Sequence, residues 1–334
     1  MSATKSVPSA SDAAEERGPR SVAMVRALAV TAVAVVLLAA VYLVGGKPTG
    51  LVTQSIVTGL LLGGVYASVS IGLTLIFGVL RVVNFAQGSL LTLAMFLVLA
   101  LSRVGVPVYV GTLLAVPVMF AVGYAIQLLL LNKLTLSGNE EGPLLITLGL
   151  SLLIINGLLM VFGGRPLNVP GSVDGAFRVF GAIVTYERLI AFAGAVLVAV
   201  VVSLLLSRTS MGLAIRAVSS NSQGASLVGV NVGRVYALTF GVGAACAAVA
   251  GGLVAPFVSL TPSVGEQFTI LAFVIVVLGG LGNVLGAMVG GLIIGLVQTV
   301  GALYLPGTGS LILVFGVFVL VLFFRPQGLF GATT

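Results

Sequence analysis

Two amide side chains, Asn84 and Gln87, interrupt a long apolar block at residues 51–101. The block is too long for one membrane span of roughly 20 residues, so it predicts two helices with a break near residues 81–88. A helix end leaves backbone donors and acceptors without intrahelical partners. The two amides can satisfy these groups, or they can offer hydrogen bonds to a polar solute that passes the break. Asn84, Gln87 and the following Gly88 are therefore candidates for a translocation path, with bracing of the break as the alternative.

Other reactive groups are scarce in this chain. It has no histidine and one cysteine, Cys246, which lies in an apolar run. A histidine-dependent catalytic triad, a histidine proton relay and an internal disulfide are excluded, and a thiolate metal site is not expected. No Gly-x4-Gly-Lys-Ser/Thr phosphate loop is present, and residues 279–286 lack the spacing of a dinucleotide-binding loop. We therefore expect a non-catalytic protein without cofactor or metal, which does not hydrolyse ATP by itself.

The composition is that of a membrane protein. Apolar residues make up 59% of the chain and charged residues only 7%. A soluble domain carries about a quarter charged residues, so this balance predicts an all-α, polytopic membrane protein embedded in a lipid bilayer. The net charge of +7 does not indicate a nucleic-acid partner, because the basic residues are scattered between the apolar runs. No carboxylate or basic group is expected within the membrane, which argues against a proton-coupled carrier.

The order of polar and apolar segments predicts the domain organisation. Residues 1–26 are polar and predict a disordered cytoplasmic tail, and residues 27–331 predict a transmembrane domain. About ten segments can cross the membrane, some of them short or broken. They lie at 27–44, 51–101 (two segments), 108–131, 144–162, 189–206, 235–256, 268–281, 284–303 and 311–324. The first is too long for the apolar core of about 7–15 residues in a signal peptide, so it predicts a retained anchor.

Lysine and arginine placement predicts the orientation of the chain. With the N-terminus inside and ten crossings, ten basic residues fall on the cytoplasmic side and five outside. This bias supports a cytoplasmic location for both termini. The longest external loop is then at about 163–188 and the longest internal loop at about 207–234. Ten spans also make an inverted repeat of two five-span halves a possible arrangement, although internal sequence similarity is weak.

Glycines recur at a spacing of four residues. Gly282, Gly286 and Gly290 form one such set. Because four residues make about one helical turn, the set predicts a flat stripe where another helix backbone approaches closely. Close packing is the simpler interpretation, and a surface that slides during conformational change is the alternative.

Three segments resemble the inner-membrane permeases of branched-chain amino acid ABC importers. They are Gly72–Gly88 (GLTLIFGVLRVVNFAQG), Leu145–Leu152 followed by Phe162–Pro166, and Arg325–Gly331 (RPQGLFG). The resemblance implies a permease domain in a bacterial cytoplasmic (inner) membrane that forms the path for branched-chain or other apolar amino acids. It also implies a second related permease subunit or a copy of this chain, two ATP-binding subunits and an external solute-binding protein.

Permeases of ABC importers also carry a cytoplasmic loop of Glu-Ala-Ala-x3-Gly type that docks on the ATPase. The nearest match here begins at Gln223 and includes Ala225 and Gly229, with glutamine and glycine in the first two places. Small residues suit a helix that docks into a cleft, and Arg216 can pair with an acidic partner surface. These four residues are candidates for the coupling loop at about 207–234, and a solvated connector is the alternative.

The solute and the transport class stay open at this point. Urea, short amides and simple sugars are alternative solutes, because a path without fixed charge suits any neutral or zwitterionic molecule. A stand-alone channel or secondary carrier is the alternative of a different class. An importer subunit depends on a separate ATPase, whereas a stand-alone channel or secondary carrier does not.

Overall fold

The computed structural model describes residues 48–136, 141–169, 173, 175–179, 181–305 and 307–330. These residues belong to one compact unit, Lys47–Thr334. The predicted tail at 1–26 and the predicted first span at 27–44 lie outside the described residues.

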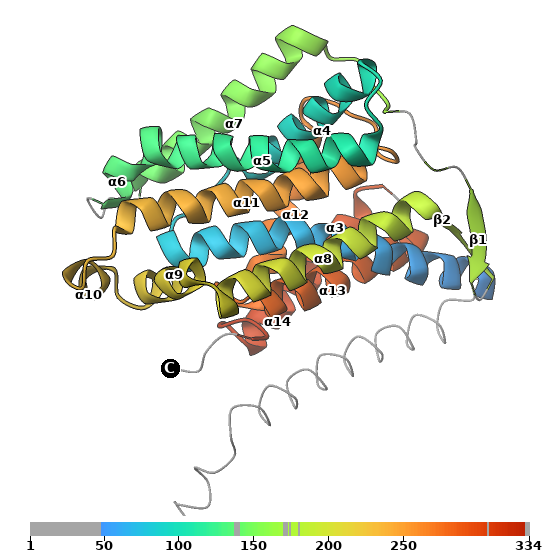
Figure 1. The fold of residues 1–334 in the computed structure, drawn as a ribbon. Coiled ribbons are helices and arrows are strands. Elements are labelled where there is room, and N and C mark those ends of the chain that lie inside the picture. The colour runs from blue at the N-terminus through green and yellow to red at the C-terminus, as the bar shows by residue number, and fades with distance from the viewer. Residues whose placement is uncertain are drawn as a thin grey trace, which may run out of the picture. The chain divides into compact units, whose positions relative to one another are not determined.

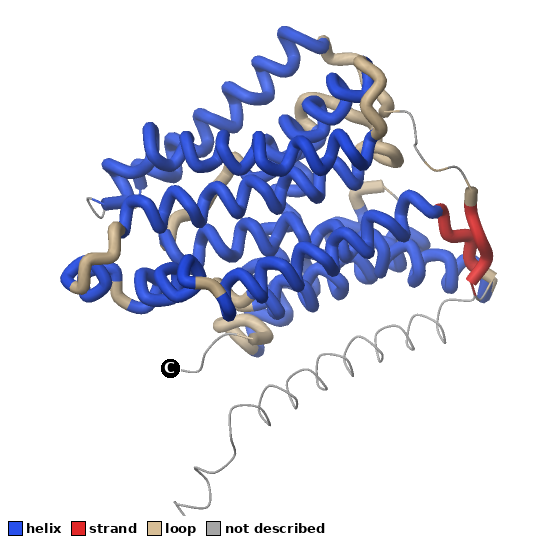
Figure 2. The backbone as a smooth tube through the Cα atoms, in the orientation of Figure 1, coloured by secondary structure: helices blue, strands red, loops and turns tan. Residues whose placement is uncertain are grey.

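Apolar helices make up most of this unit (Figures 1 and 2). Six helical segments are long and apolar enough to cross a membrane, and three apolar helices are shorter. The long ones are α3 (Thr49–Leu80), the continuous run of α5 (Val108–Ile126), η1 (Gln127–Leu131) and α6 (Asn132–Leu136), then α7 (Glu141–Phe162), α8 (Tyr186–Arg208), α11 (Val232–Val254) and α13 (Val284–Tyr304). The short ones are α4 (Gln87–Arg103), α12 (Val264–Gly279) and α14 (Gly309–Phe324). The prediction of a polytopic helical membrane protein is confirmed.

Helices α3 and α11 run side by side in opposite directions (Figure 1). Glycines form their crossing, since a Cβ on Gly72 would lie 2.6 Å from the carbonyl oxygen of Gly243. Glycine leaves out the side chain that would hold the two backbones apart. Both helices are buried along most of their length, which makes them the centre of the described unit.

Each of these two central helices has a second partner that packs through small residues. A Cβ on Gly123 of α5 would lie 3.0 Å from the carbonyl oxygen of Phe240 in α11. A Cβ on Gly63 of α3 would lie 2.8 Å from the carbonyl oxygen of Gly291 in α13. Helix α5 thus lies against α11 as α13 lies against α3.

Both central helices are followed by a link and a short helix. Residues 81–86 join α3 to α4, and residues 255–263 join α11 to α12. Arg81 ends α3 with φ at 55°, the one left-handed non-glycine residue among those described, and this conformation turns the chain out of the helix. The predicted break near residues 81–88 agrees with the end of α3 and the start of α4.

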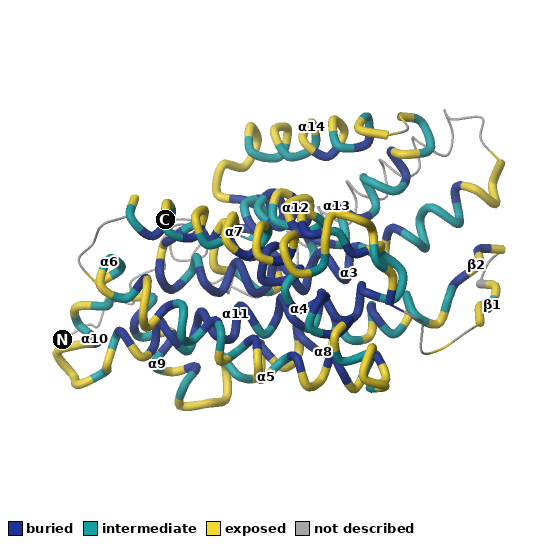
Figure 3. The backbone as a smooth tube through the Cα atoms, turned by 90° about the horizontal axis from the view of Figure 1, so that it is seen from above, coloured by how far each residue is buried: buried dark blue, intermediate teal, exposed yellow. Residues whose placement is uncertain are grey.

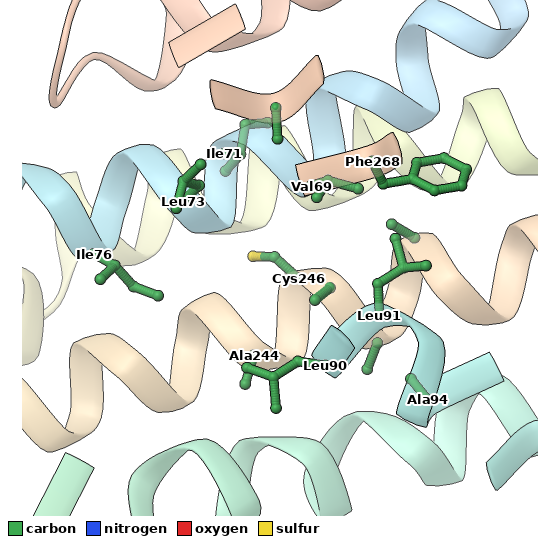
Figure 4. Close-up of a cluster of buried hydrophobic side chains, with 14 of the residues drawn as sticks. Val69, Ile71, Leu73, Ile76, Leu90, Leu91, Ala94, Ala244, Cys246 and Phe268 are labelled. Carbon is green, nitrogen blue, oxygen red and sulfur yellow. The ribbon is translucent and has the colours of Figure 1, made fainter. Parts of the chain in front are cut away.

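The core joins side chains from α3, α4, α11 and α12 (Figure 4). Ile71 of α3 and Leu90 of α4 have no exposed surface. Buried residues concentrate along α3 and α11, whereas α14 is exposed along much of its length (Figure 3). In a membrane protein such exposed apolar surface faces lipid or another subunit.

The span predicted at 108–131 is longer than expected, because the helix continues to Leu136 through the π-helical turn η1. The buried side chain of Gln127 begins this turn and donates from Nε2 to Oγ1 of Thr135 at 3.2 Å. A π turn holds one extra residue and re-aims the side chains around it. Such a turn leaves apolar periodicity almost unchanged, so the run of leucines did not reveal it.

The all-α prediction omits one short hairpin. Strands β1 (Ala176–Val179) and β2 (Ala182–Thr185) pair antiparallel within the loop predicted at 163–188 (Figure 2). The segments contain β-branched and aromatic residues, which favour extended backbone. Gln54 of α3 attaches the hairpin, because its side chain accepts from the Ile183 N–H at 2.6 Å and donates to the Ile183 carbonyl at 2.9 Å.

Candidate functional site

The link between α3 and α4 is closed by its own amide side chains. Asn84 accepts from the Ala86 N–H through Oδ1 at 3.0 Å and donates from Nδ2 to Oε1 of Gln87 at 3.3 Å. The first contact satisfies a backbone donor that the start of α4 leaves without an intrahelical partner. Asn84 therefore holds the turn that leads into α4.

Gln87 extends this arrangement to the two central helices. Its Nε2 group donates to the carbonyl oxygens of Gly243 at 3.2 Å and of Val69 at 3.4 Å. Asn84 is 1% exposed and Gln87 is fully buried. In this conformation both amides therefore brace the break, and their contact with a solute stays a prediction.

Gly88 follows the two amides and meets the start of α12. A Cβ on Gly88 would overlap the carbonyl oxygen of Gly265, and a Cβ on Gly265 would overlap that of Gly88. The Gly88 N–H donates to Oγ1 of Thr269 at 3.0 Å. The first turns of two short helices are thus in backbone contact inside the bundle.

Helix α7 is fixed to the same break from the other side. The Phe85 N–H donates to Oγ1 of Thr147 at 3.3 Å, and the hydroxyls of Ser89 and Ser151 are 2.6 Å apart. Thr147 and Ser151 are one helical turn apart, so they lie on the same face of α7. The motif at 145–152, which carried part of the family resemblance, therefore positions α7 against the break.

A polar face on α12 was missed by the analysis of apolar runs. The span was predicted to begin at Phe268, but the helix begins at Val264 and includes Glu266 and Gln267. Both of these side chains are exposed, as is Ile270 one turn further along. The helix thus carries a carboxylate in its first turn, which the predicted start at Phe268 left out. The sequence signal for the earlier start of α12 is the glycine-threonine spacing at 265–269, which is the same as the spacing at 88–92.

Glu266 lies at the depth of the middle of α3. The ring of Phe268, two residues further along α12, packs edge-on against the ring of Tyr66 with centroids 5.8 Å apart. Tyr66 is close to the midpoint of α3, a helix of 32 residues that extends about 48 Å. The exposed carboxylate thus lies on the outside of the described bundle, at a level well away from either end of its longest helix.

The candidate coupling loop contains two short helices, α9 (Ser210–Ser220) and α10 (Ser222–Leu227). Asn221 caps α10, since its Oδ1 accepts from the Gly224 N–H at 2.8 Å. Arg216 and Gln223 are exposed, as a partner-contacting role requires, whereas Ala225 is buried within the chain. The small size of Ala225 therefore serves internal packing in this structure.

The end of α10 exposes two large apolar side chains that lie outside the predicted coupling residues. Leu227 is 88% exposed and Val228 is 80% exposed. They precede Gly229, which has a left-handed φ of 87° and ends the loop helix. Apolar residues in a polar loop are the signal that could have identified this surface.

A cavity of about 250 Å³ separates this loop from the break after α3. Its walls include Arg81 at the end of α3, the corner between α9 and α10 at residues 218–223, and Tyr236 of α11. The loop, the break and the central helix α11 therefore border one shared cavity.

The predicted glycine stripe is only partly a helical stripe. Gly286 and Gly290 lie in α13 and face Gly279 and Ile275 of α12, so they permit close packing of these two helices. Gly282 lies before α13, in the turn, with φ at 84° and its Cα against Gly78. The four-residue spacing concealed this turn because it matches the helical repeat.

Groups of residues that could hold a metal ion are absent from the described ranges. Cys246 is a free thiol buried in α11. The described residues around the break present buried amides and close glycine contacts, and Glu266 lies on the exposed face of the neighbouring α12.

Comparison with known proteins gives consistent matches over nearly all of the described chain. The model of a family described as branched-chain amino acid transport system / permease component matches residues 55–322. The high-affinity branched-chain amino acid transport system permease protein BraD of Pseudomonas aeruginosa is 31% identical over 293 residues, 83% of this chain and 95% of BraD. The permease protein LivH of Escherichia coli is 30% identical over the same shares of the two chains. A probable LivH of Methanocaldococcus jannaschii is 29% identical over 73% of this chain and 80% of that protein. No solved structure matches.

Proposed function

Since the chain belongs to the branched-chain amino acid transport permease family, we propose that it is the membrane-spanning subunit of an ABC importer for branched-chain or other apolar amino acids. The observation that carries the proposal is the extent of the family match, which begins in α3 and ends in α14. It therefore includes the braced break, the contact between α4 and α12 and the loop with α9 and α10. The chain itself is non-catalytic in this proposal, and two ATP-binding subunits hydrolyse ATP.

The proposed complex contains a second permease subunit, either a relative or a copy of this chain, and receives solute from an external binding protein. The chain crosses a bacterial cytoplasmic membrane ten times, with both termini inside. The ten-to-five bias of basic residues supports this orientation. The loop with α9 and α10 then faces the cytoplasm, where ATP-binding subunits act.

We also propose that the spans form an inverted repeat in which α3, α4 and α5 correspond to α11, α12 and α13. Three relationships support it. Gly72 of α3 meets Gly243 of α11, Gly88 of α4 meets Gly265 of α12, and α5 packs on α11 as α13 packs on α3. In addition, Thr92 donates to the Gly88 carbonyl and Thr269 donates to the Gly265 carbonyl, each at 3.1 Å. Inverted repeats commonly place the solute site where their broken helices meet.

Asn84, Gln87 and Gly88 act in this proposal by setting the geometry of the path. The two amides tie the start of α4 to α3 and α11, and Gly88 admits the backbone of α12. Any shift of the break is thereby transmitted to α12. The glycine contacts of Gly286 and Gly290 transmit the same shift to α13.

The coupling loop docks on an ATP-binding subunit through Leu227 and Val228, with Arg216 and Gln223 nearby on the exposed side of the loop. An apolar pair at the end of a short helix fits a hydrophobic cleft in a partner. The cavity between this loop and Arg81 gives the docked loop space to move against the break.

The test is ATP hydrolysis by the complete complex with its binding protein. We expect leucine-loaded binding protein to stimulate hydrolysis, whereas binding protein supplied with urea or a simple sugar should not. Stimulation by urea or sugar alone would support the alternative solutes. Leucine uptake by this chain without ATP-binding subunits would instead support a stand-alone channel or carrier.

A further inference from the structure

The most unusual side chain in the bundle is the carboxylate of Glu266. It lies on α12 two residues before Phe268, whose ring packs on Tyr66 near the middle of α3. Ionisable side chains at such depth are rare in membrane helices and face a water-filled cavity or a polar partner. Glu266 is exposed in the described chain, so its carboxylate does face outward from the bundle.

The surrounding helices supply little positive charge for this carboxylate. Helices α3, α4, α13 and α14 pack against α12. Within the bounds of these four helices the sequence has one basic residue, Arg103, at the end of α4 that is remote from Gly88 and Gly265. A cationic partner from outside the bundle would therefore meet a carboxylate with no basic residue near it on these four helices.

The exposed face of α12 changes character along its length. Ser263, Glu266 and Gln267 are exposed at its start, and Ile270 follows one turn later at 51% exposure. Further along, Phe273 stacks on Phe85 of the α3–α4 link with centroids 6.5 Å apart. The face is thus polar at one end and apolar and aromatic at the other. A small molecule with an ammonium group and an apolar side chain matches this order.

We propose that Glu266 contacts the α-ammonium group of a zwitterionic amino acid in the path, while Ile270 and the Phe273–Phe85 pair contact its apolar side chain. This inference rests on the proposed importer function and specifies the chemical group that the path recognises. Opposite charge favours the ammonium over the hydroxyl and amide groups of sugars and urea. Glu266 is thereby a specificity-determining residue, and the braced break fixes the helix that carries it.

The first experiment measures leucine uptake by the complete importer in proteoliposomes, with the wild-type chain and the variants Glu266→Gln and Glu266→Asp. Loss of a hydrogen bond to an ionised group should lower the initial rate about tenfold in Glu266→Gln. Glu266→Asp keeps the charge and should recover part of the rate. Thermal unfolding should be the same in all three chains, because the side chain is exposed.

The second experiment tests whether position 266 faces an aqueous path, using single cysteines in a Cys246→Ala background. We expect Glu266→Cys and Ile270→Cys in the assembled importer to react with a small, water-soluble cationic thiol reagent, and leucine-loaded binding protein to slow the reaction at 266. Ala272→Cys is the matched control on the same helix, since Ala272 is 1% exposed and should not react.

The outcomes separate this inference from the importer function. If the wild-type complex takes up leucine and Glu266→Gln takes it up at the same rate, the ammonium contact is wrong and the importer function stands. Reaction at 266 no faster than at 272 would also reject the contact. If the wild-type complex takes up no amino acid, the importer function itself fails.

Discussion

Gly88 and Gly265 place the first turns of α4 and α12 in backbone contact, and each lacks the Cβ that would overlap the other's carbonyl oxygen. The surroundings of the two glycines also correspond, because Thr92 and Thr269 each donate to the glycine carbonyl one turn before them in their own helix. The two links that follow the central helices are thereby joined at one point. Through this contact α12, with Glu266 in its first turn, is positioned by the α3–α4 break.

Substitution of Gly88 by valine should destabilise the chain, because a side chain there must displace backbone rather than a flexible group. Overpacking of this kind costs about 1–3 kcal/mol. The expected result is a lower thermal unfolding temperature of the detergent-solubilised permease. Gly157→Val is the matched control, since Gly157 lies on an exposed face of α7 with open space around it. Equal unfolding temperatures for the two variants would contradict the close contact.

Replacement of the buried amides should affect stability and transport together. Gln87→Leu removes the bonds to Val69 and Gly243, and Asn84→Leu leaves the Ala86 N–H without its acceptor. A buried polar group left without a partner costs about 1–3 kcal/mol. Both variants should unfold at lower temperature and take up less leucine.

The comparison for the amides is Asn156→Leu, because Asn156 is exposed and its side chain donates to the Leu152 carbonyl of its own helix. Its unfolding temperature should not fall. If Asn84→Leu and Gln87→Leu lose uptake at unchanged stability, the amides contact the solute directly, as the sequence predicts for a translocation path.

The sequence revealed the spans better than the positions where they begin. Local residue order carries the family resemblance in three segments. It also predicts the break near residues 81–88. The predicted start of α12 at Phe268 is too late, because Glu266 and Gln267 lower the apolar average before it. Tertiary contacts with α4 extend the helix back to Val264. The small size of Ala225 predicts a partner contact, whereas its burial depends on packing that no local pattern records. The pairing of Gly88 with Gly265 joins residues far apart in the sequence.

Charge placed on the exposed apolar pair of the coupling loop should uncouple transport from ATP hydrolysis. Leu227→Asp and Val228→Asp are expected to abolish the stimulation of hydrolysis by leucine-loaded binding protein, because a carboxylate would have to enter an apolar cleft. Since both side chains are more than three quarters exposed, thermal stability should stay the same.

These loop variants are preferable to changes at Gly229, where the left-handed φ strains any side chain. Leu305→Asp serves as the control, because Leu305 is an exposed leucine at the far end of α13. Normal stimulation in both loop variants would remove Leu227 and Val228 from the docking surface.

The orientation can be checked with impermeant thiol reagents on intact cells in a Cys246→Ala background. A cysteine at Arg178, exposed on strand β1 of the hairpin, should react from outside, and a cysteine at Ser226, exposed on α10, should react only after the cells are opened. We expect this result because ten basic residues fall on the proposed cytoplasmic side and five fall outside. Reaction at 226 in intact cells would reverse the proposed topology.

The most direct measurement of the central claim is accumulation of labelled leucine in proteoliposomes that contain this permease, its second permease subunit and the two ATP-binding subunits. With binding protein and ATP supplied, the account predicts internal leucine above the external concentration and no accumulation when ATP or the ATP-binding subunits are omitted. Equal internal and external leucine under all conditions, or accumulation without the ATP-binding subunits, would contradict it.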